Sequence, residues 1–200
     1  MSEQAKVSNW NVPNVLTALR VVMVPVFAWV LLAHAQDPAM RWIATAVFLI
    51  AIATDALDGR IARKYNLITD FGKLWDPIAD KALTGMAFVG LSILHELPWW
   101  ITGIILVREW GITALRWVII KYGVMAANRG GKLKTVMQSV ALALFLPGLQ
   151  FLPAFWGVIA WICMIVAFAL TVLTGVDYLR EAYRLRRTYL AAHPEEGAHS

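Results

Sequence analysis

Four aspartates between residues 55 and 80 are the side chains of this sequence best suited to chemistry. Asp55 and Asp58 are three residues apart, and Asp76 and Asp80 are four apart. If both segments are helical, each pair projects from one helix face. Brought together across a helical hairpin, the carboxylates would repel one another, and in a partly buried site each like pair at about 4 Å costs several kcal/mol. Such a cluster needs bound cations.

The donor atoms of this segment indicate which cations would bind. The stretch from 55 to 80 contains neither His nor Cys, so only oxygen ligands are offered. Oxygen ligands suit hard divalent ions, and two such ions would balance four carboxylates. We therefore expect two ions of Mg²⁺ or Mn²⁺, held by Asp55, Asp58, Asp76 and Asp80.

Small residues beside the aspartates leave room for a ligand. Gly59 and Ala62 lie within one helical turn of the first pair, and Gly72 lies one turn before the second. A bulky flat group would fit against helix surfaces that carry so little side chain. Arg63, one turn after Gly59, would bring a guanidinium group to the edge of this surface, where it can meet a phosphate. Together these features suit a nucleotide diphosphate.

The segment from Asp55 to Asp80 resembles a known enzyme family. It matches the D-x2-D-G-x2-A-R-x8-G-x3-D-x3-D signature of the CDP-alcohol phosphotransferases, membrane enzymes of phospholipid synthesis, at eight positions over twenty-six residues. The resemblance implies that the four aspartates share two metal ions at the pyrophosphate of a CDP-linked lipid. It also implies that Asp80 is the general base for the acceptor hydroxyl. The residues that it assigns to the CDP-lipid are Gly59, Ala62, Arg63, Thr69 and Gly72.

Composition and charge favour a membrane protein over a soluble one. About 60% of the 200 residues are hydrophobic, ten are tryptophans, and apolar runs recur along the whole chain. We expect an all-α, polytopic integral membrane protein with six transmembrane helices and an N-terminal interfacial segment. Residues 1–185 would form one domain and 186–200 a polar C-terminal tail. The net charge of +5 sits at the ends of apolar segments, which favours anionic lipids and substrates over nucleic acid.

The first apolar segment carries polar residues on one side. Asn14, Thr17 and Arg20 share roughly one helical side. They are either an interfacial anchor whose long side chain reaches the membrane surface, or a side of the first helix that closes the nucleotide site.

A later apolar segment, 101–123, carries charges at its middle. Arg108 and Glu109 lie there, and Arg116 is eight residues after Arg108, on the same helical face. Charge at this depth is costly. Arg108 is therefore either one half of a structural pair with an acid or, together with Arg116, part of a site for an anionic acceptor.

Lys132, Lys134 and Thr135 open the next apolar segment. Cations and hydroxyls at a helix N-terminus attract phosphate, although lysines at a membrane edge also act as topological anchors. The Gly-Lys-x-Lys-Thr run and the arginines of the preceding segment resemble the glycerophosphate-using branch of the family. This implies transfer of the phosphatidyl group of CDP-diacylglycerol to sn-glycerol 3-phosphate, giving phosphatidylglycerol phosphate and CMP.

Two alternatives stay open from the sequence. A sister enzyme would use the same donor with another acceptor, such as phosphatidylglycerol in cardiolipin synthesis or an inositol phosphate, whereas an ion or metal transporter would use the buried acids for transport. With six spans, the Lys and Arg residues of loops and helix ends other than Arg41 fall on the side of both termini. The positive-inside rule places that side in the cytoplasm, with the protein in the cell (inner) membrane. By resemblance the protein is a homodimer.

Overall fold

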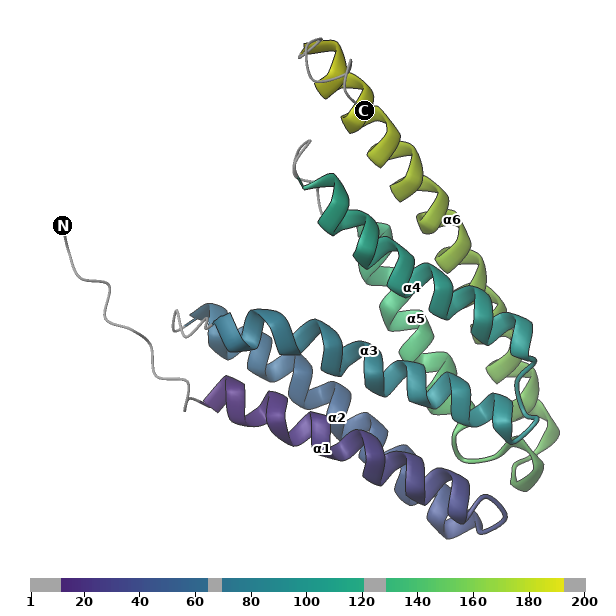
Figure 1. Cartoon of the computed structure of the whole chain (residues 1–200). Coiled ribbons are helices and arrows are strands. Elements are labelled where there is room, and N and C mark those ends of the chain that lie inside the picture. Colours follow the sequence, from purple (N-terminus) through teal and green to yellow (C-terminus); the bar gives the residue numbers. More distant parts are fainter. Residues whose placement is uncertain (1–11, 65–69, 121–128, 193–200) are drawn as a thin grey trace. The chain divides into compact units, whose positions relative to one another are not determined.

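The computed structural model describes residues 12–64, 70–120 and 129–192, and every regular element in them is a helix (Figure 1). The predicted all-α class is confirmed, since these residues contain no strand. The elements are α1 (Val12–Ala33), α2 (Pro38–Lys64), α3 (Asp70–Ile93), α4 (Trp99–Ile119), α5 (Arg129–Phe145), the short 3₁₀ helix η1 (Leu149–Phe151) and α6 (Ala154–Ala192).

Three helices of the described chain are long and apolar enough to cross a membrane, namely α1, α2 and α6. Large apolar side chains also remain exposed, among them Trp29 at 64% and Trp117 at 73%, as expected for surfaces in contact with lipid. The other helices meet these criteria less well: the apolar part of α3 that is described is short, α5 has 17 residues, and α4 contains three charged residues. The chain is therefore a membrane protein, and the count of six spans stays a prediction.

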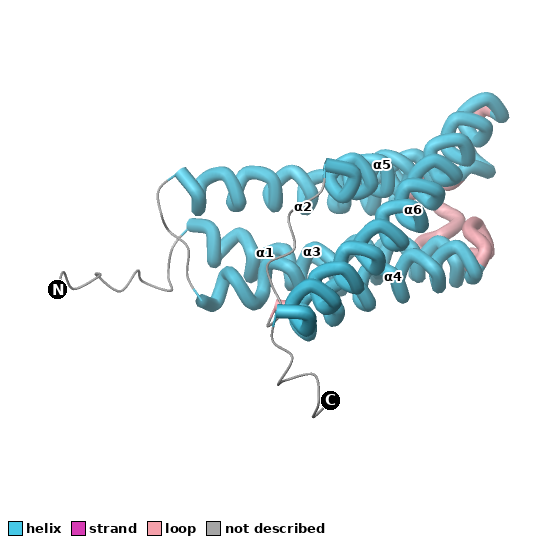
Figure 2. Tube along the Cα trace, turned by 90° about the horizontal axis from the view of Figure 1, so that it is seen from above, coloured by secondary structure: helices cyan, strands magenta, loops and turns pink. Residues whose placement is uncertain are grey.

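The helices form two compact units, residues 1–97 with 142–157 and residues 98–141 with 158–200. In the first unit α1 packs against both α2 and α3 (Figures 1 and 2). The rings of Phe27 and Phe48 lie 5.8 Å apart between α1 and α2. On α3, Gly90 allows a close approach, because a Cβ there would stand 2.6 Å from the side chain of Leu31. Small and aromatic residues thus bring α1 close to the two helices that carry the aspartates.

The turn between α1 and α2 ends at a capped helix N-terminus. The side chain of Asp37 accepts hydrogen bonds from the main-chain N–H groups of Ala39 (2.8 Å) and Met40 (3.3 Å). Pro38 occupies the first helical position, where its missing N–H costs nothing. Local sequence chemistry alone accounts for where α2 begins.

Arg41 differs from its expected place at a helix end near the surface, since it is completely buried in the first unit. Its two terminal nitrogens each donate to a carboxylate oxygen of Glu96 at 2.6 Å. Its Nε donates to the carbonyl oxygen of Leu146 at 2.6 Å, and Nη2 lies 3.3 Å from that of Phe145. One guanidinium group therefore ties together the start of α2, the segment after α3 and the end of α5.

The last helix continues well past its apolar part into a basic segment. α6 has 39 residues and continues to Ala192 without a break. It therefore extends into the range 186–200 that we expected to form a polar tail. Arginine-rich segments keep high helix propensity, so charge alone does not end the helix.

The Arg41–Glu96 pair predicts a large effect on stability. Arg41→Met should lower the free energy of unfolding by about 3 to 5 kcal/mol, because it leaves the Glu96 carboxylate and two carbonyls without the guanidinium donor. Thermal unfolding of the purified protein in detergent would measure this as a lower apparent Tm. Arg184→Met, at an exposed position of α6, is the matched control. Equal Tm values for the two variants would show that the pair contributes no stability.

Candidate active site

The four aspartates of the signature lie on two successive helices, as predicted. Asp55 and Asp58 belong to α2, and Asp76 and Asp80 belong to α3. Helical backbone at both places puts each pair on one helix face. The side chains of Asp58, Asp76 and Asp80 lie outside the described part of the structure, so their convergence on metal ions stays a prediction.

Asp55 is the signature aspartate whose side chain the structure describes. Its Oδ1 lies 2.7 Å from Nη1 of Arg20, which α1 contributes, and 40% of its side-chain surface is exposed. An all-oxygen donor set that includes a half-exposed carboxylate fits hard divalent ions such as Mg²⁺. A buried cation beside this carboxylate also reduces the repulsion that a cluster of aspartates would otherwise suffer.

The burial of Arg20 bears on the two interpretations of the first helix. The sequence left open an anchor that reaches the membrane surface, but the side chains of Arg20 and Thr17 are each only 1% exposed. Arg20 instead points at α2, which agrees with the interpretation that this side of α1 closes the aspartate site. In the sequence, this polar side of α1 was indicated by the three-residue spacing of Asn14, Thr17 and Arg20 in an apolar helix. The side chain of Asn14 lies outside the described part.

For the residues assigned to the CDP-lipid, the structure shows only the helix to which each belongs. Gly59, Ala62 and Arg63 belong to the last turns of α2, and Gly72 belongs to the first turn of α3. Thr69 lies outside the described residues, and so do the side chains of the other members of this set. Their role at a nucleotide therefore stays a prediction.

The basic residues proposed for the acceptor belong to the second unit. Arg108 and Arg116 lie on α4, and Lys132, Lys134 and Thr135 lie on α5. Since α5 begins at Arg129, the last three fall in its first two turns, as the sequence predicts. This end of α5 combines cationic side chains with the positive end of the helix dipole.

Glu109 connects two of these cations. Its Oε1 lies 3.0 Å from Nη1 of Arg108 and also accepts a short hydrogen bond from Nζ of Lys134. A second nitrogen of Arg108 donates to the hydroxyl of Thr174 on α6 at 2.8 Å. The structural pair that the sequence left open for Arg108 is therefore present. The three charged side chains are between 5% and 18% exposed, so their charges are largely shielded from water.

Tyr178 on α6 contacts the other arginine of α4, Arg116. Nη2 of Arg116 donates to the Tyr178 hydroxyl at 2.8 Å, and its guanidinium carbon lies 4.9 Å from the centre of the tyrosine ring. The guanidinium carbon of Arg108 lies 5.7 Å from the same ring. Tyr178 is only 4% exposed, whereas Arg116 is exposed. The sequence analysis missed Tyr178, because its contacts lie more than sixty positions away along the chain.

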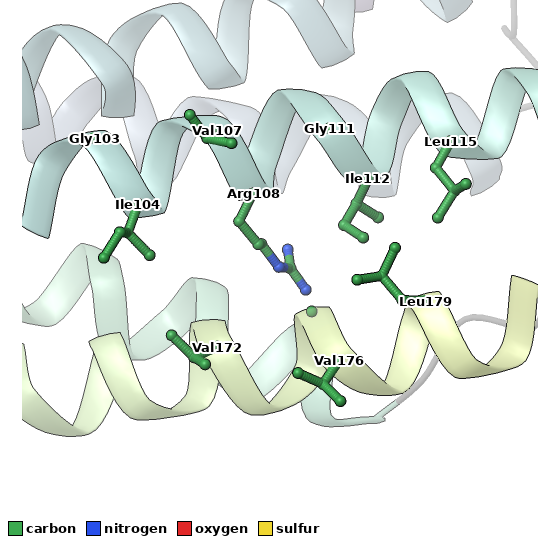
Figure 3. A pocket seen from close by; sticks show the side chains of 11 residues that line it. Gly103, Ile104, Val107, Arg108, Gly111, Ile112, Leu115, Val172, Val176 and Leu179 are labelled. Carbon is green, nitrogen blue, oxygen red and sulfur yellow. The ribbon is translucent and has the colours of Figure 1, made fainter.

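An apolar groove of about 530 Å³ runs beside this cluster between α4 and α6 (Figure 3). Gly103 and Gly111 line it, and a Cβ at either position would have no atom within 4 Å. Arg108 extends from α4 toward α6 in this region (Figure 3). Gly175 permits that conformation, because a Cβ there would stand 3.2 Å from Cγ of Arg108.

Comparison with known proteins identifies the family. The model of the CDP-alcohol phosphatidyltransferase family matches residues 10–173. The chain belongs to this family. The resemblance found in the segment from 55 to 80 thus extends over most of the sequence.

Individual relatives cover almost the whole chain. A Mycobacterium tuberculosis (strain H37Rv) protein named probable phosphatidylglycerophosphate synthase is 49% identical over 175 residues, which are 87% of this chain and 82% of the relative. A Bacillus subtilis CDP-diacylglycerol--glycerol-3-phosphate 3-phosphatidyltransferase is 36% identical over 90% of this chain and 98% of its own length. The Escherichia coli K12 protein of the same name is 37% identical over 86% of this chain and 95% of its own.

The shared carboxylate of Glu109 predicts unequal effects of two substitutions. Glu109→Gln should lower the free energy of unfolding by about 2 to 4 kcal/mol, because it removes the carboxylate that two largely buried cations contact. Lys134→Met should cost less, about 1 to 2 kcal/mol, because Glu109 keeps its contact with Arg108. Thermal unfolding in detergent would rank the two variants, with Lys132→Met, at an exposed neighbouring position, as the control. A larger decrease in apparent Tm for Lys134→Met than for Glu109→Gln would contradict the proposed balance of charges.

Proposed function

We propose that this protein transfers the phosphatidyl group of CDP-diacylglycerol to sn-glycerol 3-phosphate, forming phosphatidylglycerol phosphate and CMP. The observation that carries this proposal is the identity of 36 to 49% with relatives named for this synthesis, over 82 to 98% of their length. The complete signature from Asp55 to Asp80 supports the choice of donor. The cationic residues of α4 and α5 support an acceptor that carries a phosphate.

The aspartates are proposed to serve the donor. Asp55, Asp58, Asp76 and Asp80 would hold two Mg²⁺ or Mn²⁺ ions, which supply charge neutralisation at the pyrophosphate. Asp80 would also accept the proton of the attacking hydroxyl group. Arg20 keeps Asp55 in place through their contact at 2.7 Å. Gly59, Ala62, Arg63, Thr69 and Gly72 would hold the cytidine and phosphates of the donor.

The basic residues are proposed to serve the acceptor. The cluster of Arg108, Lys134 and Glu109 brings two cations to one carboxylate. Arg116 adds a cation whose hydrogen bond goes to a neutral hydroxyl. A phosphate group bears negative charge and several acceptor oxygens, so these groups with Lys132 and Thr135 suit a phosphorylated acceptor.

The reaction can be tested directly. The purified protein, with CDP-diacylglycerol and Mg²⁺, should release CMP when glycerol 3-phosphate is present, and release should fall to background in Asp80→Asn, which lacks the proposed base. Asp37→Asn is the matched control, because asparagine caps a helix about as well as aspartate does. Removal of divalent ions by EDTA should abolish release, and added Mg²⁺ or Mn²⁺ should restore it.

The same assay separates the alternatives. Release that depends on phosphatidylglycerol or on an inositol phosphate would keep the donor and replace the acceptor. Release that survives EDTA would contradict the proposed metal ions. Metal flux into liposomes without CMP release would favour a transporter.

We further propose six membrane spans in the cell (inner) membrane, with both termini and the aspartates on the cytoplasmic side. Assembly as a homodimer is proposed on the basis of the family resemblance alone. Loop and helix-end charges support this orientation through the positive-inside rule. The turn between α1 and α2 should then face outward.

Cysteine labelling tests the orientation. In a Cys163→Ala background, a maleimide that does not cross membranes should label Gln36→Cys in intact cells and Ser200→Cys only after lysis. The reverse pattern would invert the orientation. Labelling of both positions in intact cells would place them on the same side and exclude an odd number of spans between them, such as the five proposed.

A further inference from the structure

The cations of the second unit differ in how their charge is balanced. Arg108 and Lys134 share the carboxylate of Glu109 within a largely buried network. Arg116 makes its hydrogen bond with the hydroxyl of Tyr178, which carries no charge. Arg116 is also exposed, so its guanidinium group is not enclosed by other side chains. The guanidinium of Arg116 is therefore held in place without being neutralised by this contact.

Tyr178 holds Arg116 in two ways. Its hydroxyl accepts a hydrogen bond from Nη2 at 2.8 Å, and its ring lies under the guanidinium carbon at 4.9 Å, a distance typical of a cation–π contact. An exposed arginine otherwise samples many rotamers, and ordering it on binding costs free energy. A contact that orders the side chain beforehand lowers that cost.

Tyr178 itself is held firmly. Its side chain is 4% exposed, and its ring also lies 5.7 Å from the guanidinium carbon of Arg108. A Cβ at Gly131, in the first turn of α5, would stand 3.3 Å from the tyrosine hydroxyl oxygen. The absence of a side chain at Gly131 thus leaves space for the hydroxyl beside the end of α5 that carries Lys132 and Lys134.

We infer that Tyr178 is a positioning residue for the acceptor: it orients Arg116 so that this guanidinium binds the phosphate group of the acceptor. The inference rests on the proposed function and deepens it. Arg116 touches the acceptor, and Tyr178 acts through Arg116. Glu109 fulfils a different task, since it balances the buried cations Arg108 and Lys134.

Steady-state kinetics of CMP release test this inference. Tyr178→Phe keeps the ring and removes the hydroxyl, so it should raise KM for glycerol 3-phosphate about fivefold to tenfold, the effect of losing one hydrogen bond of ordinary net strength. The value of kcat and the KM for CDP-diacylglycerol should stay within about twofold of the wild-type values. The apparent Tm should stay within about one degree of the wild type. Tyr183→Phe, at a position 68% exposed on the same helix, is the matched control.

A double-mutant comparison shows whether the effect passes through Arg116. In an Arg116→Gln background, which itself raises KM for the acceptor, Tyr178→Phe should cause no further increase. A persistent increase would overturn the inference, because Tyr178 would then act on the acceptor by another route. So would unchanged kinetics in Tyr178→Phe, or a loss confined to kcat or to stability.

Direct binding separates this inference from the proposed function. The increase in apparent Tm caused by inorganic phosphate should be smaller in Tyr178→Phe than in the wild type and in Tyr183→Phe. If the wild type releases no CMP with glycerol 3-phosphate, the proposed reaction fails, and this comparison alone decides whether Tyr178 prepares Arg116 for an anion. Equal stabilisation of all three proteins by phosphate would overturn that role as well.

Discussion

Charge inside an apolar helical protein has to be balanced where it lies, because few water molecules are available to solvate it. The described helices meet this constraint at three places. Arg20 pairs with Asp55, Arg41 with Glu96, and Glu109 with both Arg108 and Lys134. Except for the contact between the neighbouring residues Arg108 and Glu109, these ion pairs join different helices or a helix and a connection, so the need to balance charge also constrains how the helices of each unit pack.

The charged groups of the described helices differ in how much of their charge stays available to a ligand. Arg41 donates hydrogen bonds to Glu96 and to two main-chain carbonyls, which is the pattern of a structural group. Asp55 keeps much of its side chain exposed although it contacts Arg20, which suits a residue that has to meet a ligand. Arg116 is held by a neutral partner. The degree to which a charge is neutralised therefore separates structural groups from those suited to binding.

Local spacing explains what could be predicted from the sequence. The aspartate pairs, the small residues beside them and the lysines at the start of α5 all depend on positions within a few turns, and the described backbone is helical at each of these places. Contacts between distant residues could not be predicted in this way. Arg41 was expected at a helix end near water, because its acceptors lie 55 residues or more away along the chain. Tyr178 was missed for the same reason.

The length of α6 has a consequence for where the acceptor meets the protein. The part of α6 from Val158 to Tyr178 is continuous helix, and at about 1.5 Å per residue it spans about 30 Å. That is the thickness of the hydrocarbon core of a bilayer. A helix that enters the core near Val158 and runs along the bilayer normal emerges near Tyr178, and the rest of it continues into water. The Tyr178–Arg116 contact would then lie at the boundary between lipid and water, where one substrate arrives dissolved and the other stays anchored by its acyl chains.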